Sequence, residues 1–159
     1  MMANRPYRHY QQTKVPESQS LLDIESLLRR HGIDTVRWTT GPYLICIEFL
    51  WPYGGQKIGF RLDVKVPSKD VDGFTLIDAI RDQERRRLLR VLLNHVKAKL
   101  VAVEDGLVDL LQEFLPYLIT AGGRTAGEVA AEELVCALQD GRLPDVRLLP
   151  PGNREVRQG

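Results

Sequence analysis

The sequence predicts an α+β fold in which one helix precedes a three-stranded antiparallel meander, and three C-terminal helices follow it and pack mainly on one side. Apolar residues recur at helical spacing in residues 21–28, alternate with polar residues between residues 35 and 66, and return to helical spacing after residue 76. Gly32 and Pro67 separate the two kinds of pattern. With 159 residues, of which 43% are hydrophobic, the chain can bury one core without a disulfide or metal.

The expected domain organisation is a single α+β domain over residues 18–149. Residues 1–17 combine basic and polar side chains without apolar periodicity, which predicts a flexible basic arm. Residues 150–159 are polar and predict a frayed tail, and residues 143–149 predict a packed strap. No internal repeat is visible.

Turn residues set the predicted bounds of the first half of the domain. Ser18 or Ser20 can cap the first helix, and Gly32 ends it. Period-two alternation then predicts strands over residues 35–39, 43–51 and 57–66. The second strand is apolar at nearly every position, so we expect it to be central.

Three helices are predicted after the sheet. The first spans residues 76–104 and has a core stripe, which comprises Leu89, Leu92, Leu93, Val96, Leu100 and Val103. The second begins at Leu107, carries a full apolar face as far as Leu118, and should bend at Pro116. The third begins at Thr125 and Glu128, which have capping-box spacing.

Composition also constrains where the protein acts. Cys46 and Cys136 lie in apolar contexts with no second thiol or histidine at ligand spacing, so we expect two buried thiols in a reducing compartment. Residues 1–20 lack the apolar run of a signal peptide, and no apolar stretch could span a membrane. These features predict a cytoplasmic protein with no membrane partner. No motif indicates a catalytic residue, a metal site, a cofactor or a small-molecule substrate.

The charge pattern gives the main functional prediction. Residues 85–99 contain six basic residues and no acid, whereas residues 104–140 contain eight acids and one base, although the net charge is only +1. The predicted nucleic-acid-binding residues are Arg86, Arg87, Arg90, Asn94 and Lys97. Four of these, all but Arg87, fall within about 80° on a helix and span roughly 16 Å, which suits contacts with several phosphates. The alternative is a solvated helix face whose arginines pair with Asp82, Glu84 or acids of the later helices.

Accessory contacts are predicted at two places. The basic arm offers Arg5, Arg8, Tyr10 and Lys14, and the second turn of the sheet offers Trp51 and Tyr53, whose rings could stack on a base. The alternative for the aromatic pair is that both rings fold back over the edge of the sheet.

Two further alternatives concern the sheet and its flanking helices. Asp63, Lys65, Glu48 and Glu25 resemble the αβββα core and D/E-x-K signature of restriction-type nucleases, in which carboxylates hold Mg²⁺ and a lysine orients water. Glu48 lacks the preceding proline and acid of that motif. The element order is also similar to that of double-stranded RNA-binding domains, but the basic cluster of that family opens the last helix, whereas Lys97 and Lys99 lie near its end.

Several short segments together resemble a family of small proteins encoded by bacteriophages and by bacteria that carry mobile elements. They are Val36-Arg37-Trp38, residues 96–100 with Val103-Glu104, Gly106-Leu107, residues 113–116 and Gly123-Arg124-Thr125. The resemblance covers about residues 18–149. It implies a mobile-element context, with the host cytoplasm as location, and supplies no catalytic residue.

We therefore expect a non-enzymatic binding protein whose basic helix contacts a polyanion. Nucleic acid is the principal candidate for this polyanion. One alternative is a protein-interaction module, either an inhibitor of a host defence system or a homo-oligomer that associates through the apolar residues of the last two helices. The other alternative is a Mg²⁺-dependent nuclease.

Overall fold

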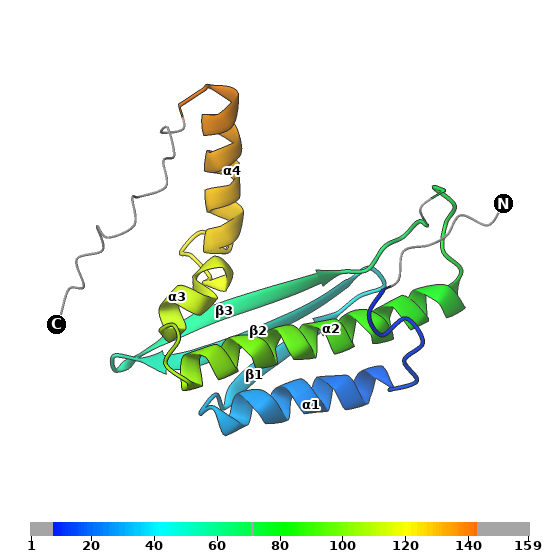
Figure 1. Cartoon of the computed structure of the whole chain (residues 1–159), viewed down its shortest axis with the longest axis horizontal. Helices are drawn as coiled ribbons and strands as arrows, with labels where there is room; N and C mark the ends of the chain where they lie inside the picture. Colours follow the sequence, from blue (N-terminus) through cyan, green and yellow to red (C-terminus); the bar gives the residue numbers. More distant parts are fainter. Residues whose placement is uncertain (1–7, 71, 143–159) are drawn as a thin grey trace, which may run out of the picture.

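A computed structural model describes residues 8–70 and 72–142 of the chain. Its elements follow one another in the order α1 (Glu17–Arg30), β1 (Thr35–Thr40), β2 (Leu44–Tyr53), β3 (Gln56–Lys65), α2 (Asp78–Glu104), α3 (Leu110–Phe114), the 3₁₀ turn η1 (Leu115–Tyr117) and α4 (Ala126–Gln139). The α+β class and the helix–meander–helices order are thus confirmed (Figure 1).

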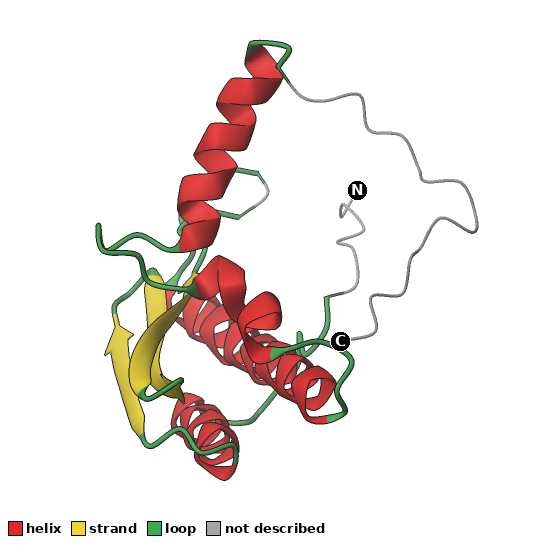
Figure 2. Ribbon diagram, turned by 90° about the vertical axis from the view of Figure 1, so that its left-hand side faces the viewer, coloured by secondary structure: helices red, strands yellow, loops and turns green. Residues whose placement is uncertain are grey.

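The three strands form an antiparallel sheet in the order β1-β2-β3. Gly54 and Gly55 both have positive φ, 57° and 79°, which is the backbone of the tight turn that joins β2 to β3. The register aligns Trp38 with Ile47 of the central strand, and Ile47 with Leu62. Residues of this inward set face α1 and α2, which both cover the same side of the sheet (Figure 2).

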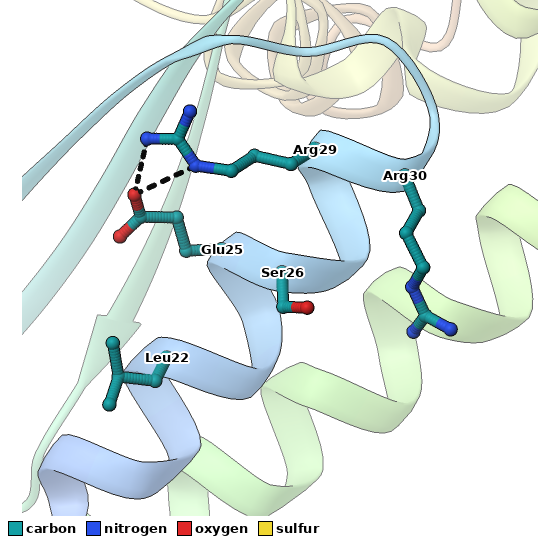
Figure 3. A pocket seen from close by; sticks show the side chains of 5 residues that line it. All are labelled: Leu22, Glu25, Ser26, Arg29 and Arg30. Atoms are coloured by element: carbon teal, nitrogen blue, oxygen red, sulfur yellow. Dashed lines mark hydrogen bonds and ion pairs between the residues drawn. The ribbon is translucent and has the colours of Figure 1, made fainter.

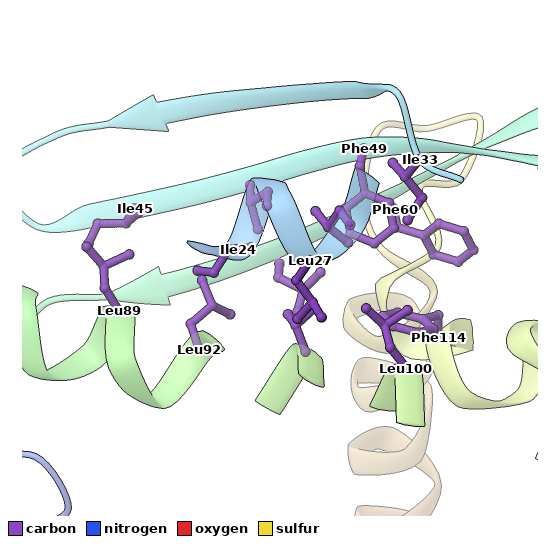
Figure 4. Close-up of a cluster of buried hydrophobic side chains, with 14 of the residues drawn as sticks. Ile24, Leu27, Ile33, Ile45, Phe49, Phe60, Leu89, Leu92, Leu100 and Phe114 are labelled. Atoms are coloured by element: carbon purple, nitrogen blue, oxygen red, sulfur yellow. The ribbon is translucent and has the colours of Figure 1, made fainter. Parts of the chain in front are cut away.

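The core lies between that sheet face and the two long helices. The predicted stripe of α2 is confirmed: Leu89, Leu92, Val96 and Leu100 are buried, and the other two members are partly buried. Phe49, Phe60 and Phe114 meet at one end of the core, with ring centroids 5.5–6.0 Å apart (Figure 4). Full burial of each such side chain contributes about 1.5–3 kcal/mol.

The ends of α1 differ in part from the prediction. The helix begins at Glu17 with Pro16 as N-cap, and no side chain caps it, so the serine caps were wrong. Ser20 lies inside the helix and is buried. Gly32 ends this region as expected, because its φ of +83° is a conformation that other residues rarely adopt.

The second C-terminal helix is much shorter than its apolar repeat predicts. The Asp109 side chain accepts a hydrogen bond from the Gln112 amide, so α3 starts only at Leu110. Pro116 has no N–H to continue the α-helical ladder, and the chain forms η1 instead. Leu107 and Leu115, expected on the buried face, are 79% and 48% exposed.

The segment after η1 attaches to the free edge of β3. Leu118 forms an isolated bridge with Phe60, and the Ile119 amide donates to the Gly59 carbonyl at 2.8 Å. A side chain at position 59 would come within 3.3 Å of Ile119, so glycine permits this close approach. The start of α4 follows directly, because the Ala126 amide donates to the Leu118 carbonyl.

Helix α4 begins as predicted but does not pack on the sheet. Both bonds of the capping box form: the Thr125 amide donates to Glu128 at 2.7 Å, and the Glu128 amide donates to the Thr125 hydroxyl at 3.3 Å. None of the residues of α4 is buried, and the helix projects away from the layers formed by the sheet, α1 and α2 (Figure 1). The sequence expectation of three helices packed together on one side therefore fails for α4.

The described part of the predicted N-terminal arm lies against α2. Gln83 donates to the carbonyls of Gln11 and Thr13 at 3.1 and 3.0 Å, and Asn94 donates to the Tyr10 hydroxyl at 2.8 Å. Arg5, the predicted strap over residues 143–149 and the predicted tail over residues 150–159 lie outside the described residues. Within the described ranges, no helix is both long and apolar enough to cross a bilayer.

Candidate polyanion-binding groove

Much of the basic run on α2 is neutralised within the molecule. Arg85 makes two bonds to Glu17, at 2.8 and 3.0 Å, and also donates to the Gly41 carbonyl. Lys99 pairs with Glu113 at 2.7 Å. Both cations are largely buried, so they stabilise the junctions of α2 with α1 and with α3 and are poorly placed to contact a ligand.

Two of the predicted binding residues are also paired. Arg87 binds Glu84 of its own helix at 3.0 Å, and Arg90 binds Asp23 of α1 at 3.1 Å. Arg86 donates to the side-chain oxygen of Gln83 at 2.7 Å, which holds the guanidinium without neutralising it. The solvated-face alternative thus describes Arg87 correctly, but it does not account for Arg86 or Lys97.

The remaining stripe residues line a groove between α1 and α2, which we call the α1/α2 groove. It has a volume of about 260 Å³ and is formed by Asp23, Ser26, Leu27, Arg30, Arg90, Leu93, Asn94 and Lys97. Three of the five predicted residues, Arg90, Asn94 and Lys97, are brought together there, whereas Arg86 and Arg87 are not among its lining residues.

Arg30 is the residue that α1 adds to this site. On the surface of α1, Arg29 turns back to Glu25, with N–O distances of 2.7 and 3.1 Å, whereas Arg30 extends toward α2 (Figure 3). Arg30 and Lys97 therefore border the same groove from two helices. Among residues 8–70 and 72–142, neither has an ion-pair or hydrogen-bond partner.

The electrostatics of the α1/α2 groove favour an anion. Its three cations and one carboxylate give a net charge of +2. Asp23 already satisfies Arg90, so the positive charge that a ligand would meet comes from Arg30 and Lys97. Ser26 and Asn94 add exposed polar groups, and Leu27 and Leu93 form apolar walls. Such a site can hold a phosphate by charge-assisted hydrogen bonds from a guanidinium and an ammonium group.

The accessory residues divide between the two ends of the molecule. Tyr10 lies beside Asn94, and Arg8 contacts Glu84 at 3.5 Å, so both lie on α2 close to the basic run. Lys14 is exposed. Trp51 is partly buried and packs against Phe114 at 6.2 Å, which agrees with the structural alternative for this ring. Tyr53 remains 51% exposed at the hairpin.

Three of the four residues of the nuclease alternative share one face of the sheet, but arginines contact both of the carboxylates among them. Glu48, Asp63 and Lys65 lie on the face of the sheet that α1 and α2 leave uncovered. Glu48 accepts from the Arg37 Nε at 2.6 Å, and Asp63 lies 3.5 Å from Arg61. Glu25 is on α1, on the other side of the sheet. In the described part of the chain, no three histidine, cysteine or acidic residues are grouped so that they could hold a metal ion.

The two cysteines have different environments, which corrects one prediction. Cys46 is buried on β2, and burial, followed by its hydrogen bond to Asp63, raises the pKa of the thiol to about 12. It is therefore protonated at neutral pH and is a poor nucleophile. Cys136 is exposed on α4, contrary to the expectation of two buried thiols.

Sequence reasoning missed Arg30 and Ser26. The Arg29-Arg30 pair looked like a favourable charge on the last turn of a helix, a sufficient local explanation. A signal was present, because Arg30, Ser26 and Asp23 recur at helical spacing and so share one face of α1. What the sequence could not show is that this face borders Lys97.

Comparison of the chain with family models, curated proteins and solved structures finds no match. The functional proposal below therefore depends on the geometry of the α1/α2 groove and of the surrounding surface.

Proposed function

We propose that the protein is a non-enzymatic binding protein that holds the phosphate backbone of a nucleic acid in the α1/α2 groove. The observation that carries the proposal is that Arg30 and Lys97 border the same groove from α1 and α2. Neither has a carboxylate partner among the described residues. Arg86, whose charge is held but not neutralised by Gln83, extends the positive surface along α2.

The spacing of these cations favours a repeating anion. Arg86 and Lys97 are 11 residues apart on one helix, a separation of about 16 Å at 1.5 Å per residue. A single small anion could neutralise only one end of such a row. A polynucleotide offers regularly spaced phosphates and can contact both ends. Tyr10, held beside Asn94, is placed to add an aromatic contact at the same surface.

The proposed setting is the cytoplasm of a cell that carries a phage or another mobile element. This part of the proposal depends on the sequence resemblance described above. An acidic protein surface is the alternative ligand for the same groove. The experiment below distinguishes the two ligands, because a groove that binds only an acidic protein would bind none of the DNA or RNA probes.

The test is fluorescence anisotropy with labelled single-stranded and duplex DNA and RNA at low salt. We expect binding that is weakened by Lys97→Ala and by Arg30→Ala. Arg87→Ala is the matched control, because it removes the same charge from a residue of α2 that Glu84 already neutralises. Absence of binding to every probe, or equal effects of Lys97→Ala and Arg87→Ala, would reject the proposal.

A second candidate function is protein interaction. The observation that favours it is the exposed apolar surface of α4, on which Leu134, Val135 and Leu138 are each more than half exposed.

A further inference from the structure

Tyr10 has a backbone conformation that tyrosine rarely adopts. Its φ is +61°, and among residues 8–70 and 72–142 every other positive φ belongs to a glycine. Only glycine enters this left-handed region without a steric penalty, because a Cβ approaches the following carbonyl oxygen there. Residues strained in this way cluster at sites that bind ligands. The strain therefore makes Tyr10 a candidate ligand contact.

Two amide side chains of α2 hold the turn that carries Tyr10, residues 8–13, which we call the arm turn (Figure 1). The Gln83 Nε2 donates to two carbonyls of the turn, at 3.1 and 3.0 Å. The Asn94 Nδ2 donates to the Tyr10 hydroxyl at 2.8 Å, and the Thr13 amide donates to the Tyr10 carbonyl at 3.0 Å. Tyr10 is thus fixed through its backbone and through its hydroxyl, yet it remains 41% exposed.

The same two amides connect the arm turn to the cations of the proposed binding surface. The Gln83 Oε1 accepts from Arg86 at 2.7 Å, so one side chain holds both the arm turn and this guanidinium. Asn94 lines the α1/α2 groove together with Lys97. Gln83 and Asn94 are 11 residues apart on α2, about 16 Å along its axis. The aromatic ring and the cations therefore belong to one continuous surface.

We propose that the ligand of the α1/α2 groove is a single-stranded nucleic acid and that one of its bases stacks on the Tyr10 ring. This inference rests on the proposed function, because it requires a phosphate backbone in the groove. A positively charged groove beside an aromatic side chain is the arrangement with which proteins bind single strands. In a duplex, neighbouring bases cover the face of each base, so the exposed ring would have no base face to contact. A ring that is already fixed also loses little freedom when a base stacks on it.

Fluorescence anisotropy tests the preference for single strands. One labelled DNA strand of mixed sequence is compared with the same strand annealed to its complement, and an RNA strand and its duplex are compared in the same way. The salt concentration is about 150 mM, where the screening length is about 8 Å. We expect each single strand to bind at least about fivefold tighter than its duplex, because stacking of one base on an aromatic side chain contributes about 5- to 140-fold in affinity. Duplexes that bind as tightly as single strands overturn this inference but leave the phosphate groove in place, whereas absence of binding to all four probes overturns both.

Variants of Tyr10 test the stacking contact. Tyr10→Leu should weaken single-strand binding by about 5- to 140-fold without changing the slope of log K against log salt, because it removes a ring and no charge. Tyr10→Phe keeps the ring and loses only the bond to Asn94, so it should weaken binding less. Tyr53→Leu is the matched control, because it removes another exposed tyrosine ring, 51% exposed at the hairpin. An effect of Tyr10→Leu that is no larger than the effect of Tyr10→Phe or of Tyr53→Leu overturns the stacking contact.

A strand without bases separates stacking from phosphate contacts. An abasic DNA strand of the same length keeps every phosphate, so it should still bind, but more weakly than the normal strand. Tyr10→Leu should have little further effect on this strand, because the base that stacks on the ring is already absent. Lys97→Ala should weaken binding of both strands, since its proposed contact is with a phosphate. A full effect of Tyr10→Leu on the abasic strand would show that the substitution acts through the arm turn, and the inference would then be wrong.

Discussion

Replacement of Lys97 by alanine should remove one phosphate contact and leave the fold intact. The side chain is exposed, and it has no ion-pair partner in the described part of the chain. Among the described residues, Arg30 and Lys97 in the groove and Arg86 further along α2 are three cations without carboxylate partners. If each meets one phosphate, three condensed counterions are released on binding.

The magnitude follows from counterion release. A slope of about −0.7 per contact for single strands and about −0.9 for duplexes gives a total of roughly −2 to −3 for log K against log salt. Between about 50 and 200 mM salt, affinity should fall about 20- to 40-fold for the original protein and about 7- to 12-fold for Lys97→Ala. Arg87→Ala should keep the original slope, because Glu84 already neutralises Arg87.

Anisotropy titrations at four or five salt concentrations give these slopes directly. Arg30→Ala should match Lys97→Ala, although it lies on a different helix, and the double variant should lose two contacts. A slope that is unchanged in both single variants would contradict this prediction, since binding would then use a different surface. Thermal unfolding of each variant checks that the comparison concerns folded protein.

Three further predictions address neighbouring features. Asp23→Asn should release Arg90 and tighten nucleic-acid binding, with a slope steeper by about 0.7–0.9. Gly127→Ala should destabilise the base of α4 by about 1 kcal/mol, because a clash costing about 1–3 kcal/mol outweighs a gain in helix propensity of about 1 kcal/mol. For His95, burial and then the nearby Lys99 lower the pKa below 6.5. Its contribution to stability should therefore be present above pH 6.5 and be lost as pH falls through the lowered pKa.

Each of these predictions has a matched comparison. Glu84→Gln frees Arg87, which lies outside the groove. Unlike Asp23→Asn, this substitution should therefore leave the salt slope unchanged. Gly122→Ala should be tolerated, because an added Cβ there meets only the Thr120 hydroxyl at 3.9 Å. Thermal unfolding at several pH values should show less acid sensitivity for His95→Gln than for the original protein. Identical pH profiles would show that His95 does not contribute.

Local patterns in the sequence were sufficient for the elements that depend on neighbours in the chain. Alternation between residues 35 and 66 predicted the meander, and the spacing of Leu89, Leu92, Val96 and Leu100 predicted the buried face of α2. Thr125 and Glu128 predicted the start of α4, because a capping box involves only residues three positions apart. The apolar repeat from Leu107 to Leu118 predicted too long a helix. The cap at Asp109 and the missing N–H of Pro116 outweighed the hydrophobic spacing.

Neighbouring residues in the chain are sufficient to predict the order and type of most elements and the presence of a basic stripe on α2. Which of these charges remain available, and which apolar faces remain exposed, depends on contacts between segments that are distant in the sequence. Glu17 lies 68 residues from Arg85 in the sequence and neutralises its charge. Arg30 and Lys97 are separated by a similar interval and border one groove, so the positive charge of each adds to that of the other. The difference is one of range, because helix and strand signals act over a few residues, whereas the effective charge of a side chain depends on every group within a few ångströms in space.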